Sequence, residues 1–497
     1  MKRISFLIVA SIAVIGFGCV MNARAQAPAP GASAEAKPAD AKPAGDTTPK
    51  EESSVTDHTI KLGNETIPYK ATAGTILLKD DNDKPIASIF YVAYVRSDVK
   101  DTSERPLAII YNGGPGSASV PLHMGAFGPK RIVTSDAEAT PPAPYRLVDN
   151  TNCLLDAADL VFIDPVGTGY SKVVGDGKGK DFWGIDEDAK SLAQFITIYV
   201  NRNNRWNSPK FLIGESYGTF RDAVLVDYLQ NHEDMYFNGI VMISTVLDFE
   251  VLSFNPGEDL SYVLYLPSYA AAAWYQKTLA DRPADLTTFL NEARQFASTD
   301  YATALAKGST LPAAERAEIV KKLAHFTGLS EDYISSANLR VSLPQFMSEL
   351  ERSKGLTIGR YDARFSGPIY DPLEEYAAYD PQSAAVSGAF AASFNQYLRE
   401  DLQFNKDQAY QMLSYPVNAG WDWDHKVPGV YTLRAAPNAE EDLVDALITN
   451  THLQVEVENG LFDLATPFFA TEYTMDHLNL PESLRGNIHL QYYDAGH

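Results

Sequence analysis

The sequence predicts an α/β protein in which a mostly parallel central sheet is flanked by helices and interrupted by a helical cap insertion. Between residues 106 and 251, short apolar runs that end in glycine-bearing turns alternate with helical segments. This order is typical of parallel sheets covered on both faces. From residue 252 to 416 the strand pattern stops, and it returns afterwards. A chain of 497 residues, 45% of them hydrophobic, is long enough for one domain with a large insertion.

Residues 1 to 25 have the pattern of a cleavable signal peptide. Lys2 and Arg3 precede an apolar run that extends to residue 20, and Ala23 and Ala25 supply small residues at a signal-peptidase site. We expect cleavage after Ala25, a periplasmic or secreted product, and no membrane span in the processed chain. A retained membrane anchor and lipidation of Cys19 are alternatives. The cleavage site disfavours the first, and the lack of an aliphatic residue just before the cysteine disfavours the second.

Residues 26 to 56 are predicted to form a disordered tether rich in alanine and proline. They contain too few periodic apolar residues to offset the entropy of ordering. The first part of the core is predicted at residues 57 to 251.

The net charge and the cysteine content limit the possible binding partners and disulfides of the protein. The 41 Lys and Arg and 64 Asp and Glu give a net charge of −23, which disfavours nucleic acid as a partner. Signal cleavage would leave Cys153 as the single cysteine, so we expect no internal disulfide and interpret Cys153 as a buried packing residue. We find no metal-ligand spacing and no phosphate-binding loop, so no metal or cofactor is expected.

The core elements follow from local patterns. Strands are expected near Ile60 and at residues 85 to 95, 107 to 111, 160 to 163, 211 to 213 and 240 to 243. A helix is expected over residues 186 to 200, with Leu192, Phe195, Ile196 and Tyr199 on one face. Such sheets place functional sites at the carboxyl ends of their strands.

Residues 252 to 416 are predicted to form the helical cap insertion. Asp285 is placed to cap one helix, and Ser342 with Gln345 forms a capping box for another. Residues 417 to 497 form the second part of the core, in which strands at 453 to 457 and 488 to 493 rejoin the sheet.

The sequence G-E-S-Y-G at residues 214 to 218 is the most specific local signal. It follows a strand and precedes a helix, which is the position of a nucleophile elbow in the α/β-hydrolase fold. The cramped turn favours glycine at positions 214 and 218, where side chains would meet neighbouring backbone. Ser216 is therefore the candidate nucleophile.

A serine hydroxyl needs a base to remove its proton and an acid to orient that base. In this fold the acid precedes the histidine, and both follow later strands. Asp463 and His497 occupy those positions. His489 within a strand and His477 within a helix are weaker candidates. Asp494 is a rival acid, but its position three residues before His497 favours a role in shaping that turn.

An oxyanion hole needs two fixed backbone N–H groups. The first is expected from Tyr217, directly after the nucleophile, and the second from the glycine-rich loop that contains Gly113, Gly114 and Gly116. A glycine run of this kind is also compatible with a simple tight turn.

Four ordered motifs, at residues 112 to 116, 164 to 171, 214 to 218 and 495 to 497, resemble those of the serine carboxypeptidase family. The resemblance implies an exopeptidase that works at acidic pH and removes residues from peptide C-termini. It implies a catalytic triad of Ser216, Asp463 and His497. It implies an oxyanion hole formed by the N–H groups of Gly114 and Tyr217. The substrate carboxylate would be bound by Asn112, the Gly113 N–H and Glu215.

The sequence departs from the family pattern at several positions. A glutamate expected fourteen residues after Asn112, which would share a proton with Glu215, is replaced by Ala126. An ionised Glu215 would then repel a substrate carboxylate unless burial raised its pKa. Ile110 and Ser117 replace a tryptophan and a cysteine. Family members continue beyond the position of His497, so we expect the natural chain to be longer.

These features favour a serine carboxypeptidase that acts on peptides through an acyl-enzyme. An esterase or acyltransferase on the same fold is the first alternative, because Ala126 weakens the case for C-terminal recognition. A binding protein that retains the fold without catalysis is the second. The sequence does not indicate the oligomeric state or the preferred side chain.

Overall fold

The computed structural model describes residues 49 to 426 and 436 to 497. The predicted signal peptide and most of the predicted tether lie outside the described residues. Among the helices of the described segments, none combines the length and the apolar character needed to cross a membrane.

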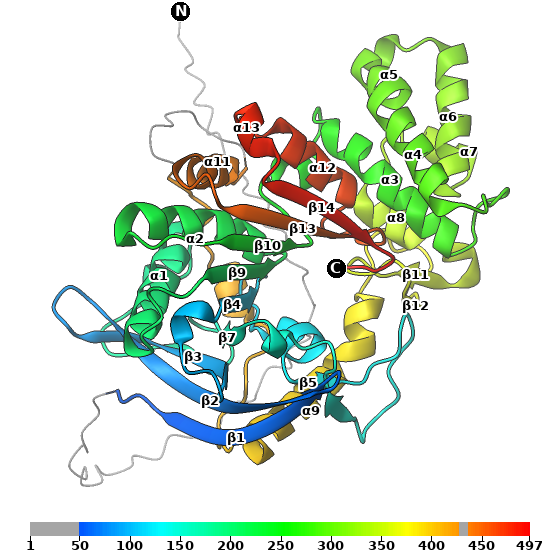
Figure 1. The fold of residues 1–497 in the computed structure, drawn as a ribbon. Helices are drawn as coiled ribbons and strands as arrows, with labels where there is room; N and C mark the ends of the chain where they lie inside the picture. The colour runs from blue at the N-terminus through cyan, green and yellow to red at the C-terminus, as the bar shows by residue number, and fades with distance from the viewer. Residues whose placement is uncertain (1–48, 427–435) are drawn as a thin grey trace, which may run out of the picture. The chain divides into compact units, whose positions relative to one another are not determined.

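A ten-stranded sheet forms the centre of the described structure (Figure 1). The strand order is β1-β2-β3-β7-β4-β9-β10-β13-β14, and β8 pairs with β3. Strands β1, β2, β3 and β7 pair in antiparallel fashion, whereas all pairs from β7 to β14 are parallel, which confirms the predicted fold class. The bounds are β1 (Ser53–Leu62), β2 (Glu65–Lys79), β3 (Pro85–Arg96), β4 (Leu107–Asn112), β7 (Asp159–Ile163), β8 (Lys172–Val173), β9 (Lys210–Glu215), β10 (Gly239–Ile243), β13 (Gln454–Gly460) and β14 (Ile488–Tyr493).

The predicted boundary between tether and core at residue 56 is wrong. Strand β1 begins at Ser53, which pairs with Gly74 of β2. Residues 53 to 56 therefore belong to the sheet. The tether prediction missed them because three of these four residues are polar, and because local composition does not reveal the strand that pairs with them and orders their backbone.

Side chains of β4 alternate between the two faces of the sheet and so define two cores. Leu107, Ile109 and Tyr111 face a core that includes α1 (Ile185–Arg202), α2 (Tyr217–Glu233) and α11 (Glu440–Thr449). Ala108 and Ile110 face the opposite core. The predicted helix over residues 186 to 200 is confirmed as α1, which buries the expected apolar face. Figure 1 shows α1, α2 and α11 along the same side of the strands.

Helices of the predicted insertion fall into two groups. The first group shares a separate apolar cluster. It consists of α3 (Leu260–Tyr275), α4 (Leu286–Phe296), α6 (Ala313–Thr327), α7 (Glu331–Ser336) and α8 (Leu343–Glu349). The predicted caps are confirmed: Asp285 accepts from the Thr288 N–H, and Ser342 and Gln345 form a capping box. A short antiparallel pair, β11 (Leu356–Ile358) and β12 (Ser366–Pro368), follows.

Helix α9 (Pro381–Glu400) does not belong to the cap cluster. Its Phe394, Tyr397 and Leu398 pack with Tyr94 and Ala108 in the second core of the sheet. The expectation of one uniform cap from residue 252 to 416 therefore needs correction, because the last long helix of this stretch covers the sheet itself. Helical periodicity reports which face is apolar but not which surface that face meets.

Candidate active site

Ser216 occupies the turn between β9 and α2 in a strained backbone conformation, with φ 59° and ψ −129°. A Cβ at Gly214 would lie 2.3 Å from Asp222 Oδ2 and 2.4 Å from the Gly218 carbonyl oxygen, so the turn excludes any side chain there. Position 218 is less crowded, since its nearest atom would be the Tyr111 carbonyl oxygen at 3.2 Å. The predicted strand-turn-helix elbow is present, and Gly214 carries the stronger steric constraint.

A buried ion pair that the sequence analysis missed supports this elbow. Arg221 on α2 donates through Nε to Asp188 Oδ2 of α1 at 2.5 Å, and through Nη1 to the Asn112 carbonyl oxygen at 2.8 Å. Its guanidinium also lies 5.1 Å from the Tyr111 ring centroid and 5.2 Å from that of Tyr217. Arg221 thereby joins α1, α2 and the end of β4. A sequence signal for this ion pair was available. Residues 217 to 230 lack a polar face, so a charged residue such as Arg221 in this helix is expected to be buried and paired.

Asp463 and His497 meet at the ends of β13 and β14, as expected. His497 Nδ1 lies 2.7 Å from Asp463 Oδ2, which also accepts from the Thr466 hydroxyl at 2.8 Å. The backbone N–H groups of Ala465 and Thr466 donate to Asp463 Oδ1 at 2.7 and 3.0 Å. These four polar contacts fix a carboxylate whose residue is wholly buried, and the carboxylate in turn fixes the imidazole ring.

In the Asp463–His497 pair, the attraction between the two groups shifts both pKa values more than burial does. Burial acts to raise the pKa of Asp463 and to lower that of His497. Their ion pair and hydrogen bond act in the opposite sense, so the Asp463 pKa is lowered and the His497 pKa is raised relative to their ordinary values. Glu215 adds to the rise at His497, whereas the positive charge of Arg360 opposes it.

Ser216 and His497 are not joined by a hydrogen bond within the described structure. His497 Nε2 is buried without a hydrogen-bond partner among the described residues and lies 3.6 Å from Glu215 Oε1. The structure therefore brings together two members of the predicted triad and leaves the ring nitrogen that would accept the serine proton available. Catalytic hydrogen bonds of free enzymes are often formed only once substrate is bound.

The glycine loop after β4 packs directly against the elbow. A Cβ at Gly113 would lie 2.5 Å from the backbone nitrogens of both Tyr217 and Gly218. Gly114 has φ +110°, a conformation that favours glycine. These contacts bring the loop that contains Gly114 beside the N-terminus of α2, where Tyr217 presents its N–H. The two predicted oxyanion donors thus come from adjoining segments.

The three residues predicted to hold a substrate carboxylate contact one another. Asn112 Nδ2 donates to Glu215 Oε2 at 3.0 Å, and the Gly113 N–H donates to the same oxygen at 3.5 Å. The donors expected to bind a substrate carboxylate are therefore occupied by the Glu215 carboxylate. Asn112 is buried and its Oδ1 accepts from the Leu122 N–H, which fixes the amide orientation.

Ala126 lies in the helical turn Pro121–Phe127, and its carbonyl oxygen accepts from Asn150 Nδ2. This position offers no carboxyl group to share a proton with Glu215.

Two residues of the insertion contact the candidate active site, and no sequence pattern predicted these contacts. The Tyr361 carbonyl oxygen accepts from the His497 N–H at 2.7 Å, and the Tyr361 ring lies 5.2 Å from the imidazole. The Arg360 carbonyl oxygen accepts from the Leu464 N–H at 3.0 Å. The segment between β11 and β12 thus contacts both loops that carry the predicted acid and base.

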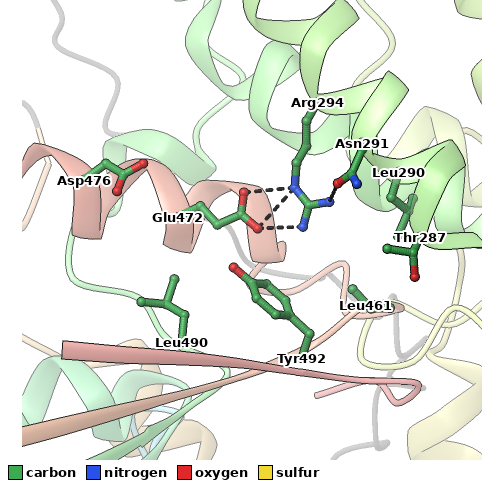
Figure 2. A pocket seen from close by; sticks show the side chains of 9 residues that line it. All are labelled: Thr287, Leu290, Asn291, Arg294, Leu461, Glu472, Asp476, Leu490 and Tyr492. Carbon is green, nitrogen blue, oxygen red and sulfur yellow. Dashed lines mark hydrogen bonds and ion pairs between the residues drawn. The ribbon is translucent and has the colours of Figure 1, made fainter. Parts of the chain in front are cut away.

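The cavity in Figure 2 lies elsewhere. It is bounded by α4, α12 (Phe468–His477) and β14, and two of its charged residues pair with each other, because Arg294 donates to Glu472 through both Nε and Nη2. None of the predicted site residues lines it. Throughout the two described segments, no group of three or more His, Cys, Asp or Glu side chains is arranged to hold a metal ion.

A serine on a strand-turn-helix elbow, with an Asp-His pair at two later strand ends of a mostly parallel sheet, defines the α/β-hydrolase class. The chain belongs to the serine carboxypeptidase family, whose sequence model matches residues 63 to 489. Serine carboxypeptidase-like 51 of Arabidopsis thaliana is 28% identical over 190 residues, which cover 36% of this chain and 38% of the relative. The pheromone-processing carboxypeptidase of Saccharomyces cerevisiae is 32% identical over 160 residues, which cover 31% of this chain and 21% of the relative.

A solved structure supports the fold. The crystal structure of a prohormone-processing carboxypeptidase from Saccharomyces cerevisiae superposes with a TM-score of 0.52 at 18% identity, covering 83% of this chain and 77% of that chain. The aligned part of this chain spans well under half of the length of the two curated relatives.

Proposed function

We propose that the protein is a serine carboxypeptidase that releases the C-terminal residue of a peptide through an acyl-enzyme on Ser216. The observation that carries this proposal is the 2.7 Å contact between buried Asp463 and His497, at strand ends that follow the elbow in the order the family requires. Family membership supports a peptidase over other uses of the same fold.

In this mechanism His497 Nε2 accepts the Ser216 proton as Oγ attacks the scissile carbonyl carbon. Asp463 holds the imidazole tautomer and stabilises the imidazolium that forms. The N–H groups of Gly114 and Tyr217 bind the developing oxyanion. The imidazolium then donates its proton to the leaving amine, and water, activated by the same ring, hydrolyses the ester.

Recognition of the C-terminus would use Asn112, the Gly113 N–H and Glu215. An incoming substrate carboxylate must replace the Glu215 oxygen that these donors now bind, or share a proton with it. Because Ala126 removes the usual second carboxyl group, this part of the site differs from the family pattern more than the triad does.

The test compares an N-blocked dipeptide that has a free C-terminal carboxylate with its C-terminal amide. We expect the acid to be hydrolysed faster, and S216A to cleave neither. Equal rates for acid and amide would overturn the carboxypeptidase assignment. Labelling of Ser216 by an organophosphonate provides an independent readout, because a binding protein without catalysis would form no adduct.

Ala126 favours one second candidate, an esterase or acyltransferase that does not need a substrate carboxylate. This alternative predicts faster turnover of a simple neutral ester than of any peptide acid, and acyl transfer to an added alcohol or amine. Both readouts use the same preparation.

We further propose export by a signal peptide that is cleaved after Ala25. N-terminal sequencing of the protein recovered from its native host tests this, and a mature N-terminus at Gln26 is the expected result.

A further inference from the structure

We propose that Arg360, which the insertion places beside the candidate catalytic centre, binds the carboxylate of the residue that the enzyme releases. This inference rests on the proposed carboxypeptidase function and names the group that selects its substrates. The carboxylate has two possible sources, the peptide C-terminus and an acidic side chain on the same residue, and the experiment below separates them.

The backbone of residues 360 to 362 is fixed on the catalytic loops. The carbonyl oxygens of Arg360 and Tyr361 accept from the N–H groups of Leu464 and His497 at 3.0 and 2.7 Å. A Cβ at Gly496 would lie 2.4 Å from both Asp362 Cβ and the Tyr361 carbonyl oxygen. Arg360 therefore cannot move away from the site unless the loops that carry the predicted acid and base move with it.

The side chain of Arg360 is exposed and its guanidinium is uncommitted. Among the described residues it has no hydrogen bond or ion pair, and its contact is with the Tyr361 ring, 5.3 Å from the centroid. Its neighbour Arg364 differs, because that guanidinium is already bound to Asp362 at 2.7 Å. Arg360 thus keeps all five donors available for a ligand.

Tyr361 connects this free cation to the proposed carboxylate-binding group. Burial raises the Tyr361 pKa, the positive charge of Arg360 lowers it, and the negative charges of Asp380 and Glu215 raise it. The ring lies 5.2 Å from the imidazole of His497. Arg360 and Glu215 therefore act on the same small region, beside the reacting groups.

The local charge explains why a cation is needed there. Glu215 occupies the Asn112 and Gly113 donors, and Ala126 supplies no second acid to share its proton. A substrate carboxylate entering this region meets one carboxylate already in place, and an unpaired guanidinium offsets that repulsion while donating charge-assisted hydrogen bonds.

The experiment uses four N-blocked dipeptides, ending in Gln or Glu, each as a free acid and as a C-terminal amide. They are measured with the wild type, R360Q, R360K and R282Q. Arg282 is the matched control, because it is an exposed arginine of the same insertion that also lies over an aromatic ring, 3.7 Å from the Trp274 centroid. Ratios of kcat/KM between peptides are compared within one variant, so that differences in folded fraction cancel.

If Arg360 binds the terminal carboxylate, R360Q should lower the acid-to-amide ratio about 10- to 100-fold for both Gln and Glu peptides. If it binds an acidic side chain, only the Glu-to-Gln ratio should fall by that factor. R360K should retain part of the preference, and R282Q should match the wild type. Unchanged ratios in R360Q, with turnover retained, would overturn this assignment alone. Absence of turnover of all four peptides by the wild type would overturn the proposed function as well.

Discussion

The turn that holds Ser216 and the region that would hold the substrate carboxylate differ in how they are built. Ser216 is fixed by steric exclusion at Gly214 and by the buried Arg221–Asp188 ion pair. The carboxylate region depends instead on half-buried Glu215 and exposed Arg360, which come from distant parts of the chain. If these residues act as proposed, the reaction geometry is set by the core, whereas selectivity is set by side chains that can change without disturbing the core.

The largest expected effect comes from the nucleophile. S216A should reduce kcat by about 10⁶-fold, because the hydroxyl that is proposed to form the acyl-enzyme is lost. Peptide turnover followed by mass spectrometry measures the loss, and an unchanged circular dichroism spectrum serves as the control for folding. Substantial residual turnover would place the nucleophile at another residue.

D463N should lower kcat by about 10⁴-fold, since the amide no longer selects the tautomer that can accept the serine proton. A loss below 10-fold would show that another acid, such as Asp494, orients the histidine.

The pH profile follows from the raised pKa of His497. Burial acts to lower this pKa, but Asp463 and Glu215 outweigh it. Since only the neutral imidazole accepts the serine proton, kcat/KM should fall as the pH drops through a value above the ordinary histidine pKa of about 6.5. This differs from the acidic working range that the family resemblance implies. In D463N the fall should move to lower pH, and an unmoved acid limb would contradict the assignment.

G214A should destabilise the fold by about 2 to 4 kcal/mol, because the added methyl collides with Asp222 and with the Gly218 backbone. Urea unfolding measures the change. G486A is the control, since a Cβ there meets nothing within 4 Å and should alter the free energy of unfolding little. Equal stabilities would mean that the elbow is less rigid than its contacts indicate.

The smallest expected effect comes from restoring the lost carboxyl group. A126E should raise the acid-to-amide ratio of kcat/KM by about 3- to 10-fold at acidic pH, where a proton can be shared with Glu215. The gain should vanish at alkaline pH. A loss at all pH values would mean that this surface has been rebuilt around alanine.

Local sequence patterns predicted the parts of the site that lie within one strand and its following turn. The elbow at Ser216 follows from glycine spacing, and Asp463 and His497 follow from two later strands. Arg360 and Tyr361 had no such signal, because their contacts with Leu464 and His497 cross more than 100 positions of the chain. The predicted helical character of residues 252 to 416 likewise gave no indication that helix α9 covers the sheet, and periodicity gave none of the Arg221–Asp188 pair.

The hydrogen bond from the His497 N–H to the Tyr361 carbonyl oxygen bears on how such enzymes can be redesigned. An insertion between two halves of a core can be exchanged as one unit, either for a shorter loop or for the cap of another hydrolase. In this protein such an exchange would remove the Tyr361 carbonyl oxygen that holds the His497 backbone in place. A chimaera would therefore lose reactivity as well as selectivity. A workable graft has to keep residues 360 to 362 and exchange only the helices on either side of them.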